Sequence, residues 1–505
     1  MKQINTKFIF LTILVGVFAG VFGSLFRILL NKAYYVRELM FSHDKPLWFH
    51  IIVLAAMWGV AVVVYYLTKI VPLISGSGIP QSKGVIFGRF KFVNPFKQFV
   101  SKFIGSVSII GMGLSLGREG PSVEIGTFGA TMISNQFNAT PTQRRYLNAS
   151  GAAAGLSAAF TAPIASTIFL IEDTLGWVSL RVGLTALMAC IIAGYISDVM
   201  IPFNIYGTIE VHAPNINPLI LLLLLIGLGL LGAVLGKFFN YALFNLKRIY
   251  KEVHFPVILK ILAIILMTYI SGMFILDLTS GGEQELIKQI ESNNGNTWII
   301  FSLVVIKIIF TAFSYSTGLC GSLLLPLIVI GGLLGKAFAL LAVGMDIVGP
   351  ESCSYFTIIG MSIMFVSVVR APISGLMLTL EMTGQYMVFF PMIIAGTITF
   401  ILGQYLRIPP VYDKLYQLMV KEEKANYEDS IVTDFKINED SYLVGKKLKA
   451  VNLPGKTSIV EVVRNGKNVA LNEDFQFKRD DLLSLKIKER EYEKLFKVFR
   501  TLSNE

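Results

Sequence analysis

Long apolar runs dominate the pattern of hydrophobic and polar positions along the chain. A helix needs about 20 mainly apolar residues to cross a bilayer. Runs near this length recur up to about residue 410, separated by short polar connections: Phe8–Leu30, Ile51–Leu67, Phe99–Leu116, Leu180–Ile201, Leu219–Leu243, Ile258–Leu276, Trp298–Phe313, Ser322–Val343, Phe356–Leu380 and Phe389–Leu406. The pattern predicts an all-α, polytopic membrane protein.

Composition excludes a soluble globular protein, since 54% of the 505 residues are hydrophobic and 15% are charged. The first apolar run is too long for a cleaved signal peptide and lacks a small-residue cleavage site. Lys2 and Lys7 then place the amino terminus in the cytoplasm of a cell-membrane protein. The three cysteines have no metal-ligand spacing, so we expect them to pack in apolar surroundings and expect no metal site.

Charge changes abruptly near residue 420. The segment 421–505 holds 33 of the 77 charged residues, which predicts a membrane domain over residues 1–420 and a cytoplasmic domain over 421–505. Most of the net charge of +11 stays on the membrane part. That excess fits cytoplasmic loops such as the one with Lys247, Arg248 and Lys251, and does not indicate nucleic-acid binding.

An internal repeat divides the membrane part into halves of about 10–215 and 216–415. Residues 151–174 match 360–383 at an offset of 209, and Pro121 matches Pro326 at an offset of 205. Transporters built from such repeats place the substrate between the halves, with helix N-termini directed at an anion. The sequence therefore predicts an anion site at the repeat interface.

Three segments rich in helix breakers carry the candidate chemistry. They are Gly76-Ser77-Gly78-Ile79-Pro80, Gly117-Arg118-Glu119-Gly120-Pro121 and Pro409-Pro410-Val411-Tyr412. An ionisable group at membrane depth is costly and marks a functional site by default, so Glu119 is the leading candidate. Three structural readings remain open: an ion pair of Glu119 with Arg118, a helix cap at Ser77 and an interfacial anchor at Tyr412.

These spaced motifs resemble the CLC family of chloride channels and chloride/proton exchangers over most of residues 10–415. The resemblance implies an inverted repeat of helices, several of them broken, and a homodimer with one anion pathway in each subunit. It also implies chloride-binding hydroxyls from Ser77 and Tyr412 and backbone amides from Leu323 and Leu324. Glu119 would be the gate, which blocks the anion path when charged and swings away when protonated.

Two departures from the family pattern bear on activity. The second-half motif, usually Gly-x-Phe-x-Pro, is Ser322-Leu323-Leu324-Leu325-Pro326, so an aliphatic side chain replaces the aromatic ring. Asp173 stands where exchangers often carry a proton-transfer glutamate, which favours a chloride/proton exchanger. A structural acid at Asp173, a cap or internal pair at Glu172, a passive chloride channel and a fluoride-exporting branch of the family remain open. Adjacent acids point to different helix faces, so we predict no catalytic dyad and no enzyme.

The tail alternates like strands at 430–437 and 458–463, has a hairpin signal at Arg464-Asn465-Gly466-Lys467 and a helical pattern over 489–502. Over about 430–500 it resembles the TrkA-C (RCK-C) domain, a small α+β regulatory module. Some of these domains bind cyclic dinucleotides, so cyclic di-AMP is a candidate ligand and no other cofactor is expected. The residues proposed for it are Ile459, Val460, Val462 and Arg464. A dimerisation or stability role of the tail is the alternative.

Overall fold

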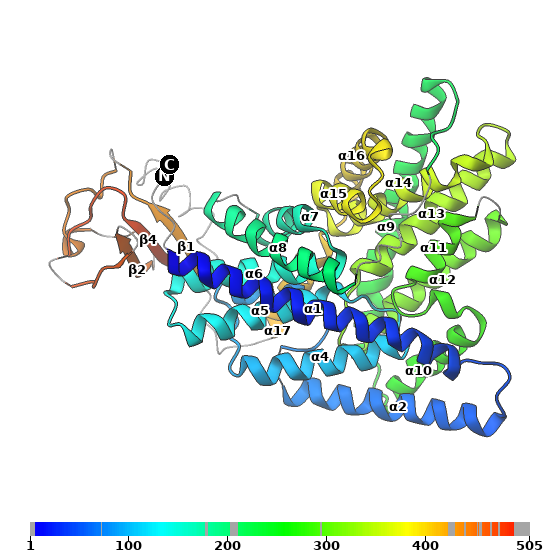
Figure 1. Cartoon of the computed structure of the whole chain (residues 1–505), viewed down its shortest axis with the longest axis horizontal. Coiled ribbons are helices and arrows are strands. Elements are labelled where there is room, and N and C mark those ends of the chain that lie inside the picture. The colour runs from blue at the N-terminus through cyan, green and yellow to red at the C-terminus, as the bar shows by residue number, and fades with distance from the viewer. Residues whose placement is uncertain are drawn as a thin grey trace.

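The computed structural model describes residues 6–71, 73–176, 180–201, 211–292, 295–422, 430–438, 441–451, 453, 457–464, 467–472 and 475–488. Within these residues, a body of long helices carries a small sheet at one end (Figure 1). In this part of the chain, nine helices are long and apolar enough to cross a membrane. The prediction of a polytopic helical protein is confirmed.

Two sets of eight helices follow each other in the same order. The first comprises α1 (Thr6–Met40), α2 (Leu47–Ile70), α3 (Ile79–Ile86), α4 (Pro95–Gly111), α5 (Glu119–Gln136), α6 (Pro141–Phe160), α7 (Pro163–Phe169, continued by the π-helical turn Leu170–Leu175) and α8 (Leu180–Met200). The second comprises α9 (Pro218–Glu252), α10 (Val257–Phe274), α11 (Glu283–Glu291), α12 (Thr297–Ser316), α13 (Leu324–Gly344), α14 (Cys353–Val369), α15 (Pro372–Thr383) and α16 (Phe389–Tyr405). The amphipathic helix α17 (Val411–Glu422) follows.

Two apolar runs that the sequence presents as continuous do not form single helices. The run Phe99–Leu116 extends past α4, which ends at Gly111, and the chain then turns into the loop before α5. The run Phe356–Leu380 is divided between α14 and α15, because Arg370 adopts a left-handed φ of 68° and Pro372 starts a new helix. Broken helices of this kind leave backbone groups available inside the protein.

In each half, glycines let two helices cross closely, and the two crossings are equivalent. A Cβ on Gly126 of α5 would lie 2.0 Å from the carbonyl oxygen of Gly151 in α6. At the repeat-related crossing of α13 and α14, a Cβ on Gly331 would lie 2.3 Å from the carbonyl oxygen of Gly360. Small residues at membrane-helix crossings allow such backbone approach. The repeat seen in the sequence therefore corresponds to equivalent packing in three dimensions.

The tail forms a four-stranded sheet in the order β1-β4-β2-β3. Its strands are β1 (Ser430–Lys436), β2 (Ser458–Arg464), β3 (Lys467–Asn468) and β4 (Leu482–Lys488). The two predicted strands are confirmed, and Arg464 pairs with Lys467 as the predicted hairpin requires. Asn465, Gly466 and the predicted helix over 489–502 lie outside the described residues.

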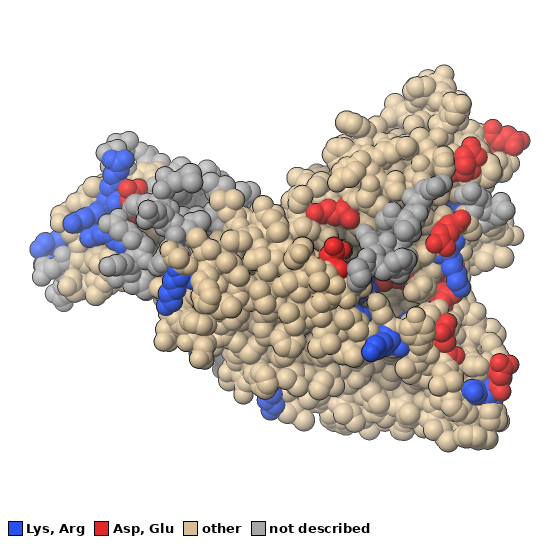
Figure 2. All heavy atoms as spheres, viewed as in Figure 1, with Lys and Arg blue, Asp and Glu red and all other residues tan. Residues whose placement is uncertain are grey.

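Charged side chains are sparse over the middle of the visible face of the helical body (Figure 2). Lysines and arginines gather on the tail at one end, and acidic and basic side chains occur at the other end. A band with few charged side chains between two more highly charged ends is the surface expected of a protein that spans a bilayer.

Candidate functional site

The loops that precede three helices meet inside the protein. Gly117 and Ser322 exchange backbone hydrogen bonds of 2.7 and 2.9 Å, which join the loops before α5 and α13. The loop before α3 joins them through Gly76, whose N–H donates to the carbonyl of Gly318 at 3.1 Å. The first N–H groups of each helix have no partner within that helix and carry its positive dipole end. The junction is therefore suited to negative charge.

Glu119 is the first residue of α5 and is 0% exposed. Its carboxylate folds back over the preceding turn, where a Cβ on Gly117 would lie 2.2 Å from Oε2. Among the described residues, neither carboxylate oxygen has a hydrogen-bond partner. Arg118 pairs with Glu283 at 3.1 Å, which does not fit the alternative of a Glu119–Arg118 ion pair. Glu119 is thus a buried acid beside helix N-termini, without a fixed partner in that region.

Three buried hydroxyls lie in a row next to this acid. Ser77 Oγ is 3.2 Å from Ser322 Oγ, which is 3.4 Å from Tyr412 Oη. Ser77 does not cap α3, because Gly78 is the N-cap residue and its N–H binds Gln81. Tyr412 is 0% exposed, which does not fit an interfacial anchor.

The hydroxyl of Ser322 is a site group that the sequence motifs do not predict. From the sequence, Ser322 is expected only as part of the backbone motif before α13, although serine in place of the family's glycine is an available signal. Leu323 and Leu324 stand at the N-cap and first position of α13, so their amides belong to its positive end. Both leucine side chains are buried.

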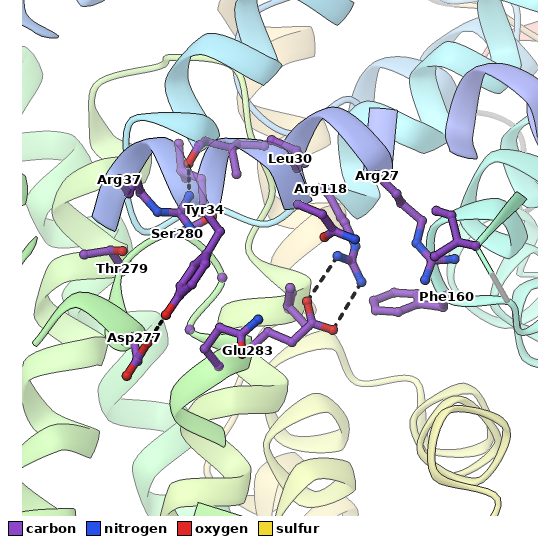
Figure 3. A pocket seen from close by; sticks show the side chains of 18 of the residues that line it. Arg27, Leu30, Tyr34, Arg37, Arg118, Phe160, Asp277, Thr279, Ser280 and Glu283 are labelled. Carbon is purple, nitrogen blue, oxygen red and sulfur yellow. Dashed lines mark hydrogen bonds and ion pairs between the residues drawn. The ribbon is translucent and has the colours of Figure 1, made fainter. Parts of the chain in front are cut away.

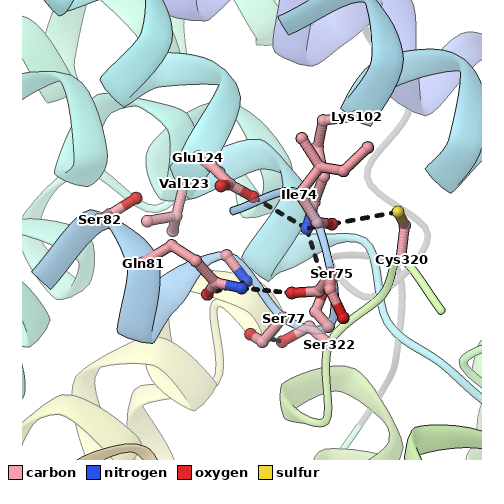
Figure 4. A network of polar contacts seen from close by, with 12 residues as sticks. Ile74, Ser75, Ser77, Gln81, Ser82, Lys102, Val123, Glu124, Cys320 and Ser322 are labelled. Atoms are coloured by element: carbon pink, nitrogen blue, oxygen red, sulfur yellow. Dashed lines mark hydrogen bonds and ion pairs between the residues drawn. The ribbon is translucent and has the colours of Figure 1, made fainter. Parts of the chain in front are cut away.

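Lys102 of α4 holds the loop that carries Ser77 (Figure 4). Its ammonium donates to the carbonyls of Ile74 at 2.9 Å and Gly76 at 2.8 Å, and it pairs with Glu124 at 2.8 Å. Both partners of this ion pair are fully buried. A buried pair costs desolvation free energy and is disrupted strongly when one partner is removed. Lys102 therefore positions the Ser77 loop.

The second half of the repeat has an equivalent buried lysine, but it lacks the acidic partner that Lys102 has in Glu124. Lys307 lies 205 positions after Lys102 and donates to the carbonyls of Leu278 at 2.7 Å and Ser280 at 2.8 Å. Val329 occupies the position equivalent to Glu124. The two halves thus share backbone architecture but differ in buried charge.

Asp173 lies in the π-helical turn after α7, with 9% of its surface exposed. Its backbone carbonyl accepts a hydrogen bond from Lys83 at 2.7 Å, and Lys83 also pairs with Asp413. Asp173 Oδ2 has no hydrogen-bond partner within the described residues. Lys83 and Asp413 were not predicted, because they lie 90 and 240 positions from Asp173 in the sequence. Asp173, Lys83 and Asp413 together form a second cluster of ionisable side chains at the site.

Glu172, next to Asp173, has a different environment. Its carboxylate accepts from the N–H of Ile373 at 3.1 Å and of Ser374 at 2.7 Å, at the start of α15. In return, Glu381 of α15 accepts from Ile164 and Ala165 at the start of α7, at 3.0 and 2.6 Å. The expectation that Glu172 caps or pairs internally fits this geometry.

Comparison with protein families identifies the membrane domain. The family model described as voltage gated chloride channel matches residues 59–404, and the TrkA-C domain model matches residues 432–500. This chain belongs to the voltage gated chloride channel family. The tail carries the TrkA-C domain that its strand pattern indicated.

Known family members are similar along most of the chain. The H(+)/Cl(-) exchange transporter ClcA of Vibrio vulnificus is 30% identical over 439 residues, covering 83% of this chain and 91% of that protein. ClcA of Klebsiella pneumoniae is 30% identical over 428 residues, covering 83% and 90%. The crystal structure of a slow cyanobacterial Cl-/H+ antiporter superposes with a TM-score of 0.77 at 24% identity, covering 84% of this chain and 100% of that one. The chain therefore has the voltage gated chloride channel fold.

A cavity of about 220 Å³ is lined by Arg118, the residue before Glu119 (Figure 3). Arg27, Arg37 and Arg118 line it, and Arg118 and Glu283 face each other across it. Leu325, the second residue of α13 and a neighbour of Glu119, also lines the cavity. Three arginines and two acids, Asp277 and Glu283, thus line a cavity next to the loop that precedes Glu119.

The four residues proposed for a tail ligand lie on β2 but differ in exposure. Val462 is in the tail core, Ile459 packs partly against it, and Val460 is exposed. Arg464 donates to both carboxylate oxygens of Asp481 at 2.7 and 2.8 Å, and this hydrogen bonding raises the pKa of Arg464. A phosphate at Arg464 would have to share the guanidinium with Asp481 or displace it.

Proposed function

We propose that this chain exchanges chloride for protons across the cell membrane, with Glu119 as the gate. The observation that carries the proposal is a buried carboxylate without a fixed partner, next to three hydroxyls and three helix starts. The names of the relatives, H(+)/Cl(-) exchange transporters, support the same activity. A transporter assignment agrees with the expectation that the chain is not an enzyme.

Chloride would bind between the hydroxyls of Ser77 and Tyr412 and the backbone amides of Leu323 and Leu324. Hydroxyl and amide donors hold an anion without a formal positive charge, so binding remains weak enough for release. Ser322 Oγ lies between the two predicted hydroxyls and would be a third donor.

The charge of Glu119 would couple the two ions. When ionised, its carboxylate competes with chloride for the positive helix ends; when protonated, it loses that attraction and leaves the path to the anion. Each protonation then accompanies an opening of the anion path. Proton movement and anion movement become linked through one side chain.

Asp173 would pass protons between Glu119 and the cytoplasm. It is a buried acid with one oxygen lacking a hydrogen bond in the described region, near Lys83 and Asp413. Replacing it by Asn would remove the titratable group while preserving its size. We expect Asp173→Asn to retain chloride flux and to lose most proton flux.

Reconstituted vesicles test the proposal. Chloride efflux and external pH are recorded together after an outward chloride gradient is imposed. An exchanger moves protons against their own gradient in proportion to chloride flux. Chloride currents without any proton movement would instead support a passive channel, the alternative function, and fluoride flux exceeding chloride flux would support the fluoride-exporting branch.

We also propose that the TrkA-C domain regulates transport, with cyclic di-AMP as the candidate ligand. The supporting observation is a direct link to the membrane domain: Glu461 of β2 accepts from the N–H and the hydroxyl of Thr142, both at 3.1 Å, in the first turn of α6. Titration calorimetry of the full-length protein with cyclic di-AMP tests this. We expect the unmodified protein to give heat of binding and Arg464→Ala to give none. If the unmodified protein gives no heat, a dimerisation or stability role of the tail is the remaining alternative.

Assembly and orientation complete the proposal. We propose a homodimer with one pathway in each subunit, as the family resemblance implies, and both termini in the cytoplasm. The basic residues Lys247, Arg248 and Lys251 at the end of α9 support that orientation through the positive-inside rule.

A further inference from the structure

A second cavity lies outside the proposed ion pathway. It has a volume of about 410 Å³ and is formed by the end of α9, the start of α10 and the end of α12. Its wall includes Ile249, Leu259 and Phe313, whose side chains are 42%, 51% and 38% exposed. Exposed apolar side chains on membrane-crossing helices face acyl chains, so this cavity is a groove on the lipid-facing surface.

The chain segment that forms much of the groove carries an excess of positive charge. Between residues 247 and 260 the chain has four basic side chains, Lys247, Arg248, Lys251 and Lys260, and one acidic side chain, Glu252. Arg248 Nε lies 3.8 Å from Glu252 Oε1, so the charge of the one acid is balanced by Arg248. Lys260, which lines the groove, therefore belongs to a basic stretch of the chain where α9 ends and α10 begins.

Lys260 and Tyr250 form a polar boundary within the groove itself. The Lys260 ammonium donates to the carbonyl of Tyr250 at 2.7 Å and lies 5.0 Å from the centre of its ring. The Tyr250 hydroxyl is buried and makes no hydrogen bond within the described part of the chain. A fixed ammonium thus stands next to apolar walls.

We propose that this groove binds one anionic phospholipid. One acyl chain would lie against Ile249, Leu259 and Phe313, and the phosphate would meet the Lys260 ammonium. An acyl chain that moves from lipid into an apolar groove gains little free energy, because the bilayer is equally apolar. The headgroup therefore decides affinity, and basic side chains near a membrane surface favour anionic headgroups. Binding here does not require the proposed exchange activity.

Native mass spectrometry of the full-length protein tests the proposal. The protein is delipidated in detergent containing equal amounts of phosphatidylglycerol and phosphatidylcholine, and the lipids retained per chain are counted. We expect retained phosphatidylglycerol in preference to phosphatidylcholine. Ala263→Trp, which fills the groove from α10, should remove the retained lipid, whereas Ala56→Trp, at an exposed position on α2, should keep it.

A charge variant tests the headgroup contact separately and does not alter the groove volume. Lys260→Gln should lower phosphatidylglycerol retention about five-fold, the equivalent of about 1 kcal/mol per basic side chain. Lys97→Gln, at an exposed position near the start of α4, should leave retention unchanged. Equal retention of both lipids by the unmodified protein, or undiminished phosphatidylglycerol in Ala263→Trp and Lys260→Gln, would overturn the proposal.

Discussion

At the residue scale, Glu119 differs from three other acids of the membrane domain. Glu124 pairs with Lys102, and Glu172 and Glu381 accept hydrogen bonds from helix N-termini. Glu119 has no hydrogen-bond partner among the described residues. A buried carboxylate without a hydrogen-bond partner is costly to keep charged, which favours a change of its protonation.

Glu119→Gln should separate the two ion fluxes. Glutamine keeps the shape of the side chain but carries no charge and takes up no proton, so chloride flux should continue and coupled proton flux should disappear. Simultaneous recording of chloride efflux and pH in vesicles measures both. Glu283→Gln changes the ion-pair partner of Arg118 in the cavity of about 220 Å³ and should keep proton coupling. Proton uptake by Glu119→Gln at the unmodified rate would contradict the gating role.

Ser322→Ala should weaken chloride binding. The substitution removes one hydroxyl from the row of three and keeps the backbone bonds of residue 322 to Gly117. A hydrogen bond to a charged partner contributes about 1.5–3 kcal/mol, so chloride affinity should fall about tenfold or more in calorimetry. Ser362→Ala, whose hydroxyl binds Ile359 within α14, serves as the control. Unchanged affinity would mean that the Ser322 hydroxyl does not contact the anion.

At the element scale, the reciprocal caps tie the halves together. Glu172 follows α7 and caps α15, while Glu381 lies in α15 and caps α7. Each short helix therefore depends on a carboxylate from the other half. Acids at helix N-termini stabilise through both hydrogen bonds and the helix dipole.

Glu172→Gln and Glu381→Gln should each lower the stability of the protein by about 1–2 kcal/mol, the size of a lost charged cap. Thermal unfolding in detergent should show both variants melting below the unmodified protein. Glu38→Gln, at an exposed position on α1, should melt like the unmodified protein. If the two cap variants matched Glu38→Gln, the caps would contribute no stability.

Most of the helices could be predicted from apolar run length, and the repeat could be read from matching residues. The sequence did not predict where runs break, because the turn at Arg370 depends on packing that a hydropathy pattern does not contain. The motif segments around Ser77 and Glu119 were recognisable by their breakers and by family resemblance. Lys83, Asp413 and the hydroxyl of Ser322 were missed, since their roles follow from contacts between residues at least 90 positions from their partners.

At the scale of the whole molecule, one buried contact joins the tail to the membrane domain. Glu461 and Ser484 both bind Thr142, and Glu461 is 5% exposed. The contact lies at the N-terminus of α6, which packs against α5, the helix that begins with Glu119. A movement of the sheet would therefore be passed to the start of α5, where Glu119 lies, through two helices.

Glu461→Ala should loosen this connection. The Thr142 N–H would lose its acceptor, so hydrogen exchange in the first turn of α6 should accelerate about tenfold, as expected for the loss of about 1.5 kcal/mol of local protection. Hydrogen-exchange mass spectrometry of the full-length protein measures this. Val460→Ala, at the exposed neighbouring position of β2, is the matched control. Equal exchange in both variants would show that the contact does not stabilise α6.

The reciprocal caps also constrain the order of events during synthesis. The α7 segment leaves the ribosome about two hundred residues before Glu381, because the chain is made from its amino terminus. Until that residue arrives, the N–H groups of Ile164 and Ala165 cannot make these two hydrogen bonds. Folding of the first half can therefore be completed only after most of the second half has been inserted.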